Sequence, residues 1–295
     1  MKILFIGKVQ FSEEILIYLI KKNIIITGIV TDSKKGINSD HCDLTHAGNK
    51  YNICSHVTQN INSIKSEKWI KRMRPDLILC IGWSHLIKEN ILSIPSHGIV
   101  GYHPTELPEN RGRHPIIWSL ALGLKHTAST FFLMNKKADS GKILNQKKVI
   151  IKKNYDSEKL YKNLIKVAKI QILQVIQDFE KNKVKFLRKK KASSNVWRKR
   201  NYLDGKIDWR MSASTIYNLI RALNKPYPGA YFVWKKNNFI VWKADLIYLK
   251  NKSNIEPGKV LKVSKNNFIT VKCGEGIIVL KNIKPNIKLK KGDYL

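Results

Sequence analysis

The chain is poor in acidic residues and cysteine, and it contains no long apolar run. Of its 295 residues, 21 are Asp or Glu and 55 are Lys or Arg, which gives a formal net charge of +34. The four cysteines show no Cys-x-x-Cys spacing, so a disulfide framework is excluded. No apolar stretch approaches the ~18 residues of a membrane span, and the first residues show no secretory cleavage site. These absences predict a soluble, cytoplasmic protein without a membrane partner.

Signatures for binding dinucleotides, nucleoside triphosphates and metals are also missing. The segment Gly7-Lys8-Val9-Gln10-Phe11-Ser12 follows the first apolar run but lacks the Gly-x-Gly-x-x-Gly pattern, and no Walker sequence occurs. Five residues of zinc-ligand type lie close together in the sequence: His41, Cys42, His46, Cys54 and His56. Their spacings match no common zinc pattern. We therefore expect a polar loop there and no metal.

Basic residues occur along the entire chain. Most are lysines, and many Ile and Asn residues accompany them, as in the product of a compositionally biased coding sequence. Net charge alone is therefore weak evidence for a nucleic-acid partner. One local feature is sharper, because the segment 181–200 holds ten basic residues and no acidic one. This segment is either a solvated linker or a surface that faces the phosphates of a polynucleotide or a nucleotide.

The hydrophobic pattern predicts two domains. Up to about residue 150, short apolar runs alternate with helical patterns, which favours βαβ units and a mainly parallel sheet. The expected strands are 3–6, 24–30, 77–81, 99–102 and 130–134, and the expected helices are one capped by Ser12, 64–73, 116–122 and 156–180. A helix at 212–223 then precedes five short strands, at 230–234, 239–244, 258–263, 268–273 and 276–280, which suggest a small open barrel.

We therefore predict an α/β protein with a Rossmann-like domain over residues 1–185 and an OB-like β-barrel domain over 207–295. A basic linker over 186–206 would join them.

His103 and Asp139 are the most informative residues of the chain. His103 follows the apolar run 99–102, and Asp139 follows the apolar run 130–134. In a parallel sheet both would emerge at the carboxyl ends of strands, where open α/β folds place their sites. An imidazole oriented by a carboxylate moves protons at neutral pH. The pair therefore predicts a catalytic centre beside a loop rich in Pro, Gly and Arg.

Several blocks in the chain resemble one known family. They are His103-Pro104-Thr105-Glu106-Leu107-Pro108, Arg111-Gly112-Arg113-His114-Pro115, Ala138-Asp139-Ser140-Gly141, Ile207-Asp208-Trp209 and Pro226-Tyr227-Pro228-Gly229-Ala230. In this order they resemble the folate-dependent formyltransferases, which include methionyl-tRNA formyltransferase and the amino-sugar formyltransferases of surface-polysaccharide synthesis. The resemblance covers nearly the whole chain. It implies transfer of a formyl group from the co-substrate 10-formyltetrahydrofolate to a primary amine.

The resemblance also implies roles for individual residues. His103 and Asp139 correspond to the catalytic His and Asp of the family, which move a proton from the attacking amine to the departing folate nitrogen. The folate site would contain Gly82, Trp83, Arg113, Asn135, Lys136, Lys137, Ala138 and Asp139. The acceptor substrate would contact Tyr102, Pro104, Arg198, Lys199, Arg200, Arg210 and Asn218.

Gly101 departs from the pattern of the family. Most relatives carry Asn two residues before the catalytic His, where its amide helps to stabilise the oxyanion. Such a donor is commonly worth ~3 kcal/mol. Asn110, His114 or backbone NH groups are the candidate substitutes, and reduced activity is the alternative. A non-catalytic folate-binding relative and a hydrolase that releases formate are further alternatives.

The preferred acceptor is a nucleotide-linked amino sugar. The segments Arg111–Trp118 and Trp197–Arg200 resemble the sugar enzymes more closely than the tRNA enzyme. The pyrophosphate of such a substrate would meet the cations Arg198, Lys199, Arg200 and Arg210. The alternative acceptor is initiator methionyl-tRNA, because a basic linker and a basic C-terminal barrel suit a polynucleotide. The sequence leaves the nucleotide, the sugar and a homodimeric state open.

Overall fold

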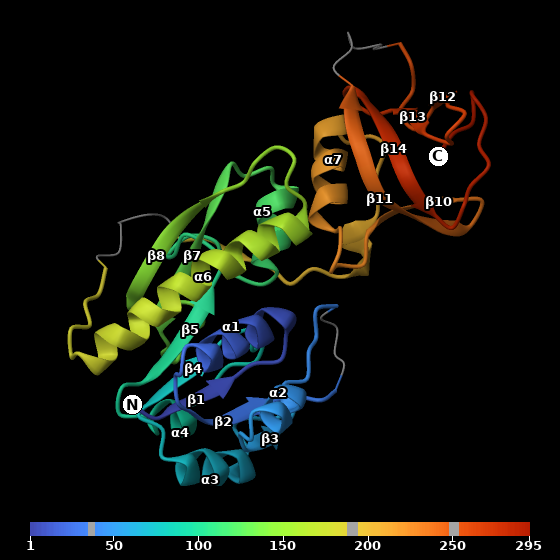
Figure 1. Ribbon diagram of the computed structural model, residues 1–295. Coiled ribbons are helices and arrows are strands. Elements are labelled where there is room, and N and C mark those ends of the chain that lie inside the picture. Colours follow the sequence, from blue (N-terminus) through green and yellow to red (C-terminus); the bar gives the residue numbers. More distant parts are fainter. Residues whose placement is uncertain (35–38, 188–193, 248–253) are drawn as a thin grey trace. The chain divides into compact units, whose positions relative to one another are not determined.

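The computed structural model describes residues 1–34, 39–187, 194–247 and 254–295. These residues form two compact units (Figure 1). The first unit comprises 1–115, 127–149 and 161–197, and the second comprises 116–126, 150–160 and 198–295. Four basic residues of the predicted linker lie outside the described residues: Arg188, Lys189, Lys190 and Lys191.

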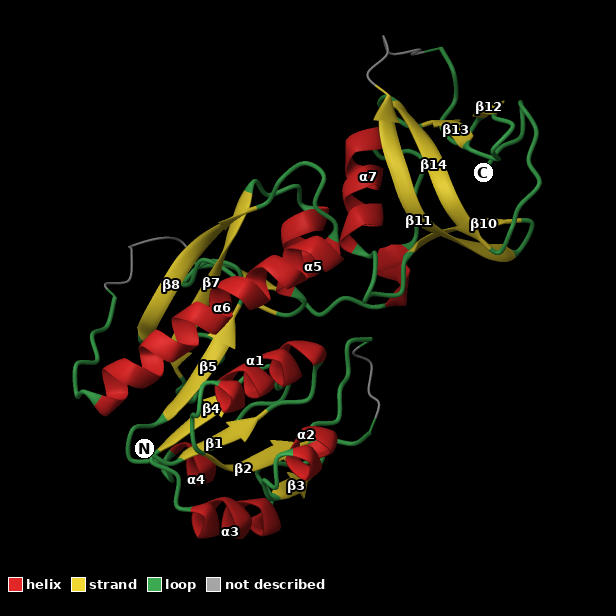
Figure 2. Cartoon of the chain, viewed as in Figure 1, coloured by secondary structure: helices red, strands yellow, loops and turns green. Residues whose placement is uncertain are grey.

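A seven-stranded sheet forms the centre of the first unit (Figure 2). Its strands are β1 (Ile3–Ile6), β2 (Ile26–Thr31), β3 (Ser55–Val57), β4 (Leu77–Cys80), β5 (Ile99–His103), β7 (His126–Leu133) and β8 (Ile143–Ile150). Their spatial order is β3-β2-β1-β4-β5-β7-β8. β1 to β5 are parallel, whereas β7 is antiparallel to β5. The predicted α/β fold with a mainly parallel sheet is confirmed.

The pattern of burial follows from this order. All four residues of β1 are fully buried, as expected for a central parallel strand that is covered on both faces. At one edge, β8 buries only Ile143 and Val149 and exposes polar residues between them. β3 has only three residues. The sequence did not predict these two edge strands, because neither carries a sustained apolar run.

Helices connect the strands of the N-terminal half. They are α1 (Gln10–Lys21), α2 (Thr45–Lys50), α3 (Ile64–Met73), α4 (Glu89–Leu92), α5 (Pro115–Ala121) and α6 (Ser157–Glu180). The positions of α3, α5 and α6 agree with the prediction to within one residue. None of the helices in the described part of the chain is long and apolar enough to cross a membrane.

The first helix begins earlier than predicted. Ser12 was expected to precede α1 as its cap, but the helix starts at Gln10 and extended Val9 is the residue before it. The Ser12 hydroxyl accepts the N–H of Val9 at 3.4 Å and donates to the carbonyl of Ile81 at 2.6 Å. Ser12 therefore stabilises the helix from inside its first turn and ties α1 to the end of β4.

A buried ion pair lies at the carboxyl ends of β1 and β2, next to the point where the strand order reverses between β1 and β4. Lys8 follows β1, Asp32 follows β2, and their side chains are 3.1 Å apart and 8% exposed each. The Lys8 ammonium is also 5.0 Å from the centre of the Trp83 ring and 3.5 Å from Nε2 of His85. Burial, and then the Lys8 charge, lower the pKa of His85. This cluster fixes the carboxyl ends of three strands together.

Residues 194–197 of the predicted linker pair with the first unit. β9 (Val196–Trp197) is parallel to β6 (Arg111–Gly112), with Arg111 opposite Val196 and Gly112 opposite Trp197. Both short strands belong to the first unit. The segment that follows the basic run is therefore bonded to the loop beyond β5.

The second unit contains a five-stranded antiparallel sheet with the order β10-β11-β14-β13-β12. The elements are η1 (Tyr202–Gly205), α7 (Ala213–Ala222), β10 (Ala230–Trp234), β11 (Asn237–Ile247), β12 (Val260–Val263), β13 (Ile269–Lys272) and β14 (Ile277–Lys284). Ser212 caps α7 by accepting the N–H of Thr215 at 3.1 Å, and α7 packs against β11 (Figure 1). Among the described residues, no pairing of β10 with β12 closes the sheet, so it is barrel-like but open.

The variant Lys8→Met should lower the free energy of unfolding by about 3–5 kcal/mol, because it leaves the buried Asp32 carboxylate without its partner. Lys71→Met is the matched control. Lys71 pairs with Glu67 at 2.7 Å, but its side chain is 59% exposed, so its loss should cost less than about 1 kcal/mol. Urea denaturation followed by circular dichroism measures both. If the two substitutions lower the free energy of unfolding equally, the buried pair does not contribute more to stability than the exposed pair.

Candidate active site

His103 is the last residue of β5, and its side chain lies on one face of the sheet. Side chains alternate along a strand, so Gly101 shares this face whereas Tyr102 lies on the other. The Tyr102 ring contacts Phe11 and Phe131, with centroid distances of 4.7 and 4.9 Å. Burial raises the pKa of its phenol. Tyr102, a predicted substrate contact, is thus part of the packing on the face opposite His103.

Both ring nitrogens of His103 lie near acceptor oxygens. Nε2 is 3.0 Å from the backbone carbonyl oxygen of Asn110, and Nδ1 is 3.7 Å from Oδ1 of Asp139. The residue is only 5% exposed, so little water competes for these contacts. The structure therefore brings together the two residues that the sequence singled out as a catalytic pair.

Asp139 reaches His103 by a route that the sequence did not indicate. The expectation that both follow parallel strands is wrong, because β7 is antiparallel to β5 and pairs Thr130 with His103 and Leu133 with Val100. β7 thus ends beside the start of β5, and the connection to β8 carries Asp139 back to the imidazole. Asp139 has φ +51°, a left-handed conformation that Asp tolerates better than most residues.

A backbone amide holds the Asp139 carboxylate. The N–H of Gly112 donates to Oδ2 at 3.1 Å, which leaves Oδ1 on the side of His103. Gly112 has φ +105°, and a Cβ there would lie 2.3 Å from the carbonyl oxygen of Trp197. Only glycine fits this combination of conformation and close approach. The pairing of β6 with β9 therefore fixes the orientation of the carboxylate.

The position of the missing Asn, Gly101, is filled by neighbouring side chains. A Cβ at Gly101 would lie 2.9 Å from Cγ of Met134 and 2.9 Å from Cζ of Phe132. No side chain fits there unless these two move. Among the candidate substitutes, Asn110 turns its carbonyl oxygen to His103, and its side-chain oxygen accepts from Asn195 at 3.0 Å.

The predicted folate residues come from three connections of the first unit. Gly82 and Trp83 follow β4, Arg113 follows β6, and residues 135–138 follow β7. Arg113 donates to the carbonyl of Ser84 at 2.7 Å, which links the first two connections. The Nε1 donor of Trp83 is buried and has no hydrogen-bond partner among the described residues. A buried indole N–H is a group that a bound ligand with an acceptor oxygen or nitrogen would satisfy.

The third connection is a compact turn. Oδ1 of Asn135 accepts the N–H of Lys137 at 3.0 Å and the hydroxyl of Ser140 at 2.8 Å. Lys136 extends outward and lies 3.6 Å from Glu89. Ala138 is part of the same turn. These bonds hold the backbone that presents Asp139.

Pro104 and the loop beyond it are fastened to the sheet. The Pro104 carbonyl accepts from the Thr127 hydroxyl at 2.7 Å, and the Thr105 carbonyl accepts from the Thr130 hydroxyl at 2.6 Å. The Leu107 carbonyl accepts from the Gln146 amide at 3.0 Å. The loop that leads from His103 to Asn110 is therefore anchored along its length.

The other predicted substrate residues lie in the second unit, where two arginines stack on one indole. The guanidinium carbons of Arg198 and Arg200 are 5.4 and 4.7 Å from the ring centre of Trp118. Arg198 pairs with Asp204 and lowers the pKa of that carboxylate. Arg200 is 8% exposed, and burial lowers the pKa of its guanidinium. Arg198 and Lys199 are exposed, whereas Arg200 is part of the packed cluster.

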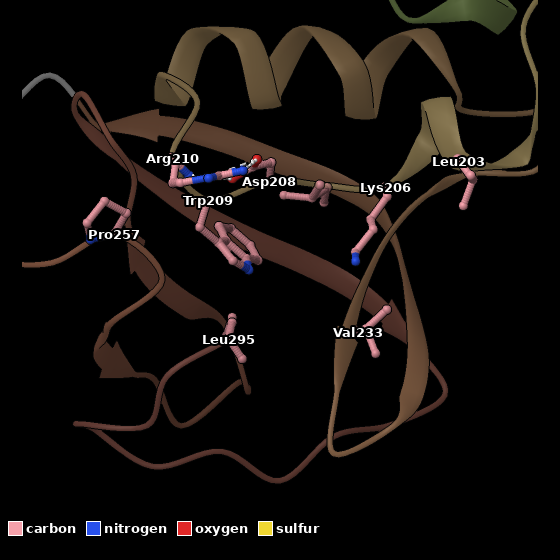
Figure 3. A pocket seen from close by; sticks show the side chains of 9 residues that line it. Leu203, Lys206, Asp208, Trp209, Arg210, Val233, Pro257 and Leu295 are labelled. Carbon is pink, nitrogen blue, oxygen red and sulfur yellow. Dashed lines mark hydrogen bonds and ion pairs between the residues drawn. The ribbon is translucent and has the colours of Figure 1, made fainter.

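Arg210 lines a cavity of about 540 Å³ in the second unit (Figure 3). Its guanidinium forms hydrogen bonds to Asp208, and these lower the pKa of the Asp208 carboxyl to about 2. Asn218 lies on α7, and its side-chain oxygen accepts from Arg221 at 2.9 Å. Each of these predicted contacts thus has a partner within its own unit.

Sequence reasoning missed two backbone contributions to the site. The carbonyl of Asn110 faces the imidazole, and the amide of Gly112 holds the carboxylate. The Arg-Gly motif marked this loop, but nothing in the sequence indicated which backbone groups would point inward. Asn195, which bonds to Asn110, gave no signal because it is one polar residue in a basic segment.

Comparison with known proteins gives the class. Residues 1–176 match the formyl transferase family, and residues 200–291 match its C-terminal domain. The chain is 30% identical over 288 residues to methionyl-tRNA formyltransferase of Wigglesworthia glossinidia brevipalpis, which covers 95% of this chain and 88% of that protein. The chain therefore belongs to the formyl transferase family. It is a folate-dependent formyltransferase.

Two further relatives are informative. The bifunctional polymyxin resistance protein ArnA of the same organism is 35% identical over 224 residues, which cover 76% of this chain and 33% of that longer protein. This chain thus spans about a third of the length of ArnA. A solved N-formyltransferase structure from Helicobacter canadensis, in complex with folinic acid and dTDP-3-aminofucose, has a TM-score of 0.72 at 17% identity. The match covers 95% of this chain and 99% of the Helicobacter canadensis chain.

The variant Gly101→Asn should lower the free energy of unfolding by about 1–3 kcal/mol, because the new side chain must displace Phe132 and Met134. Gly101→Ala is the graded control and should have a smaller effect of the same sign. Thermal denaturation and formyl-transfer rates are measured together. A Gly101→Asn protein that is as stable as the wild type and transfers faster would show that the missing amide had limited the enzyme.

Proposed function

We propose that this enzyme transfers the formyl group of 10-formyltetrahydrofolate to the primary amine of a nucleotide-linked amino sugar, for surface-polysaccharide synthesis. The observation that carries the proposal is the placement of His103 and Asp139, with 3.7 Å between Nδ1 and Oδ1 at the end of β5. An imidazole and a carboxylate at this separation, in a site mostly closed to water, can carry one proton between two nitrogens.

Each step of the transfer needs a group of this kind. The bound folate supplies an activated formyl carbon. As the amine nitrogen attacks that carbon, His103 accepts the proton that the amine loses. His103 then returns the proton to the folate nitrogen, whose bond to the formyl carbon breaks. Asp139 stabilises the imidazolium that exists between these two events.

The folate site proposed for this chain consists of Gly82, Trp83, Arg113, Asn135, Lys136, Lys137, Ala138 and Asp139. Two features support it. Trp83 offers a buried N–H that no described residue accepts, and Arg113 is exposed and fixed to Ser84, so that it can meet an anionic group. No group of three or more His, Cys, Asp or Glu side chains suited to a metal occurs among the described residues.

Two observations support a sugar nucleotide as the acceptor. The Helicobacter canadensis enzyme, crystallised with dTDP-3-aminofucose, matches this chain over almost the full length of both proteins. Arg198 and Lys199 are exposed cations. Arg198 is already oriented by Asp204 and by the face of Trp118, so it would meet a pyrophosphate at little conformational cost.

The second candidate acceptor is the amino group of initiator methionyl-tRNA. It is favoured by the relative that matches 95% of this chain, and by exposed cations on the second unit. A polynucleotide would need many such cations at once, whereas a pyrophosphate needs two or three.

The variants His103→Gln and Asp139→Asn should each lower kcat by about 10²-fold or more, which is the usual contribution of general acid–base catalysis. The fold should remain intact. His46→Gln is the control, because His46 is exposed on α2 and should transfer at the wild-type rate. Release of tetrahydrofolate measures kcat, and circular dichroism monitors folding. Near-normal turnover in either site variant would refute the assigned roles.

Acceptor identity is tested by offering methionyl-tRNA and a panel of dTDP-, UDP- and GDP-linked amino sugars separately. We expect turnover on a sugar nucleotide and a decrease of less than about tenfold in kcat/KM between 50 and 200 mM salt. Turnover on tRNA alone, with a loss of about 10³-fold or more over that range, would overturn the sugar assignment. Folate binding without turnover on any acceptor would indicate a non-catalytic relative.

A further inference from the structure

The Asn110 carbonyl that faces His103 depends on a left-handed backbone conformation. Asn110 has φ +58°, in a region that Asn adopts more readily than most residues other than glycine. Neighbouring hydrogen bonds support this conformation over the others that Asn can adopt. Here it directs the carbonyl oxygen to within 3.0 Å of Nε2 of His103.

Asn195 supplies that support. Its side-chain oxygen accepts the N–H of Asn110 at 2.7 Å, and its side-chain amide donates to the side-chain oxygen of Asn110 at 3.0 Å. Its own carbonyl accepts the N–H of Arg111 at 3.2 Å. One residue outside the sequence blocks that carry the family resemblance thus satisfies three polar groups of the loop.

The Asn110 contact decides which ring nitrogen of His103 carries the proton. A carbonyl oxygen can only accept, so Nε2 must donate to it. In the neutral ring, the lone pair then lies on Nδ1. The distance from Nδ1 to Oδ1 of Asp139 is 3.7 Å, longer than the 2.7–3.2 Å typical of an N–H···O hydrogen bond. Nδ1 is therefore not engaged by the carboxylate.

We propose that Asn195 is a positioning residue for His103. Through Asn110 it keeps the proton of the neutral ring on Nε2, so that Nδ1, on the side of Asp139, is the nitrogen that takes up and returns the transferred proton. The inference rests on the proposed role of His103. When the amine attacks the formyl carbon, Nδ1 takes one proton from it and the ring becomes an imidazolium. Both N–H groups then face acceptors, the Asn110 carbonyl and the Asp139 carboxylate. When the bond from the formyl carbon to the folate nitrogen breaks, Nδ1 returns the proton to that nitrogen.

The first test is the tautomer of His103, measured by nitrogen-15 NMR on the free, full-length protein and assigned by comparison with His103→Gln. We expect the neutral ring to carry its proton on Nε2. The variant Asn195→Ala should shift this ring to a mixture of tautomers. Ser194→Ala is the matched control: Ser194 accepts from the side chain of Arg111 at 2.6 Å and does not contact Asn110, so the spectrum should stay unchanged.

The second test is kinetic. Asn195→Ala should lower kcat about tenfold, the scale of one lost hydrogen bond, with less than a twofold change in KM for the folate. Asn195→Asp keeps the acceptor for the Asn110 N–H and should give an intermediate rate. Ser194→Ala should transfer within twofold of the wild type. If Asn195→Ala does not fold, the kcat of Asn195→Asp and the His103 tautomer of the wild-type protein still test the positioning role.

The outcomes separate this inference from the function on which it rests. A wild-type protein that protonates Nδ1 in the neutral ring, or an Asn195→Ala protein with wild-type kcat and tautomer, would overturn the positioning role. A wild type that turns over no acceptor would instead refute the proposed function, because the tautomer is measured without any acceptor.

Discussion

The candidate site depends on a short pairing of two strands, β6 and β9. Gly112 uses its N–H to hold the Asp139 carboxylate, and the carbonyl of Asn110 accepts from the imidazole of His103. The two members of the proposed catalytic pair come from distant parts of the chain, and the loop between Asn110 and Gly112 bonds to both. This loop is in turn held by backbone bonds to Asn195 and Trp197. The geometry of the pair therefore depends on a segment that lies beyond the sheet in the sequence.

The packing of β5 explains why the loop has this role. Positions 101 and 103 of β5 face the same side of the sheet. Phe132 and Met134 occupy the space that a side chain at position 101 would need. β5 therefore offers no polar side chain besides His103 itself on this face. The groups that face the pair come from backbone atoms instead. Backbone groups are fixed by neighbouring hydrogen bonds and lose no side-chain entropy when they contact a reacting group.

Much of the fold follows from the order of apolar runs. The strands that were predicted are those with continuous burial, such as β1 and β4, whereas β3 and β8 were missed because they are short or exposed at an edge. The helices α3 and α6 were predicted closely because their apolar spacing is regular. Ser12 was assigned to the wrong position, because Val9 is extended and the first turn of α1 forms before the serine.

The sequence by itself determined the residue types of the site, since an imidazole and a carboxylate after apolar runs are recognisable without coordinates. It also determined the class of enzyme, through motifs that cover nearly the whole chain. Only the tertiary structure decided how Asp139 reaches His103, because the direction of β7 depends on pairing with β5 and not on its own sequence. The same holds for Asn195, whose contact with Asn110 joins residues that are 85 positions apart.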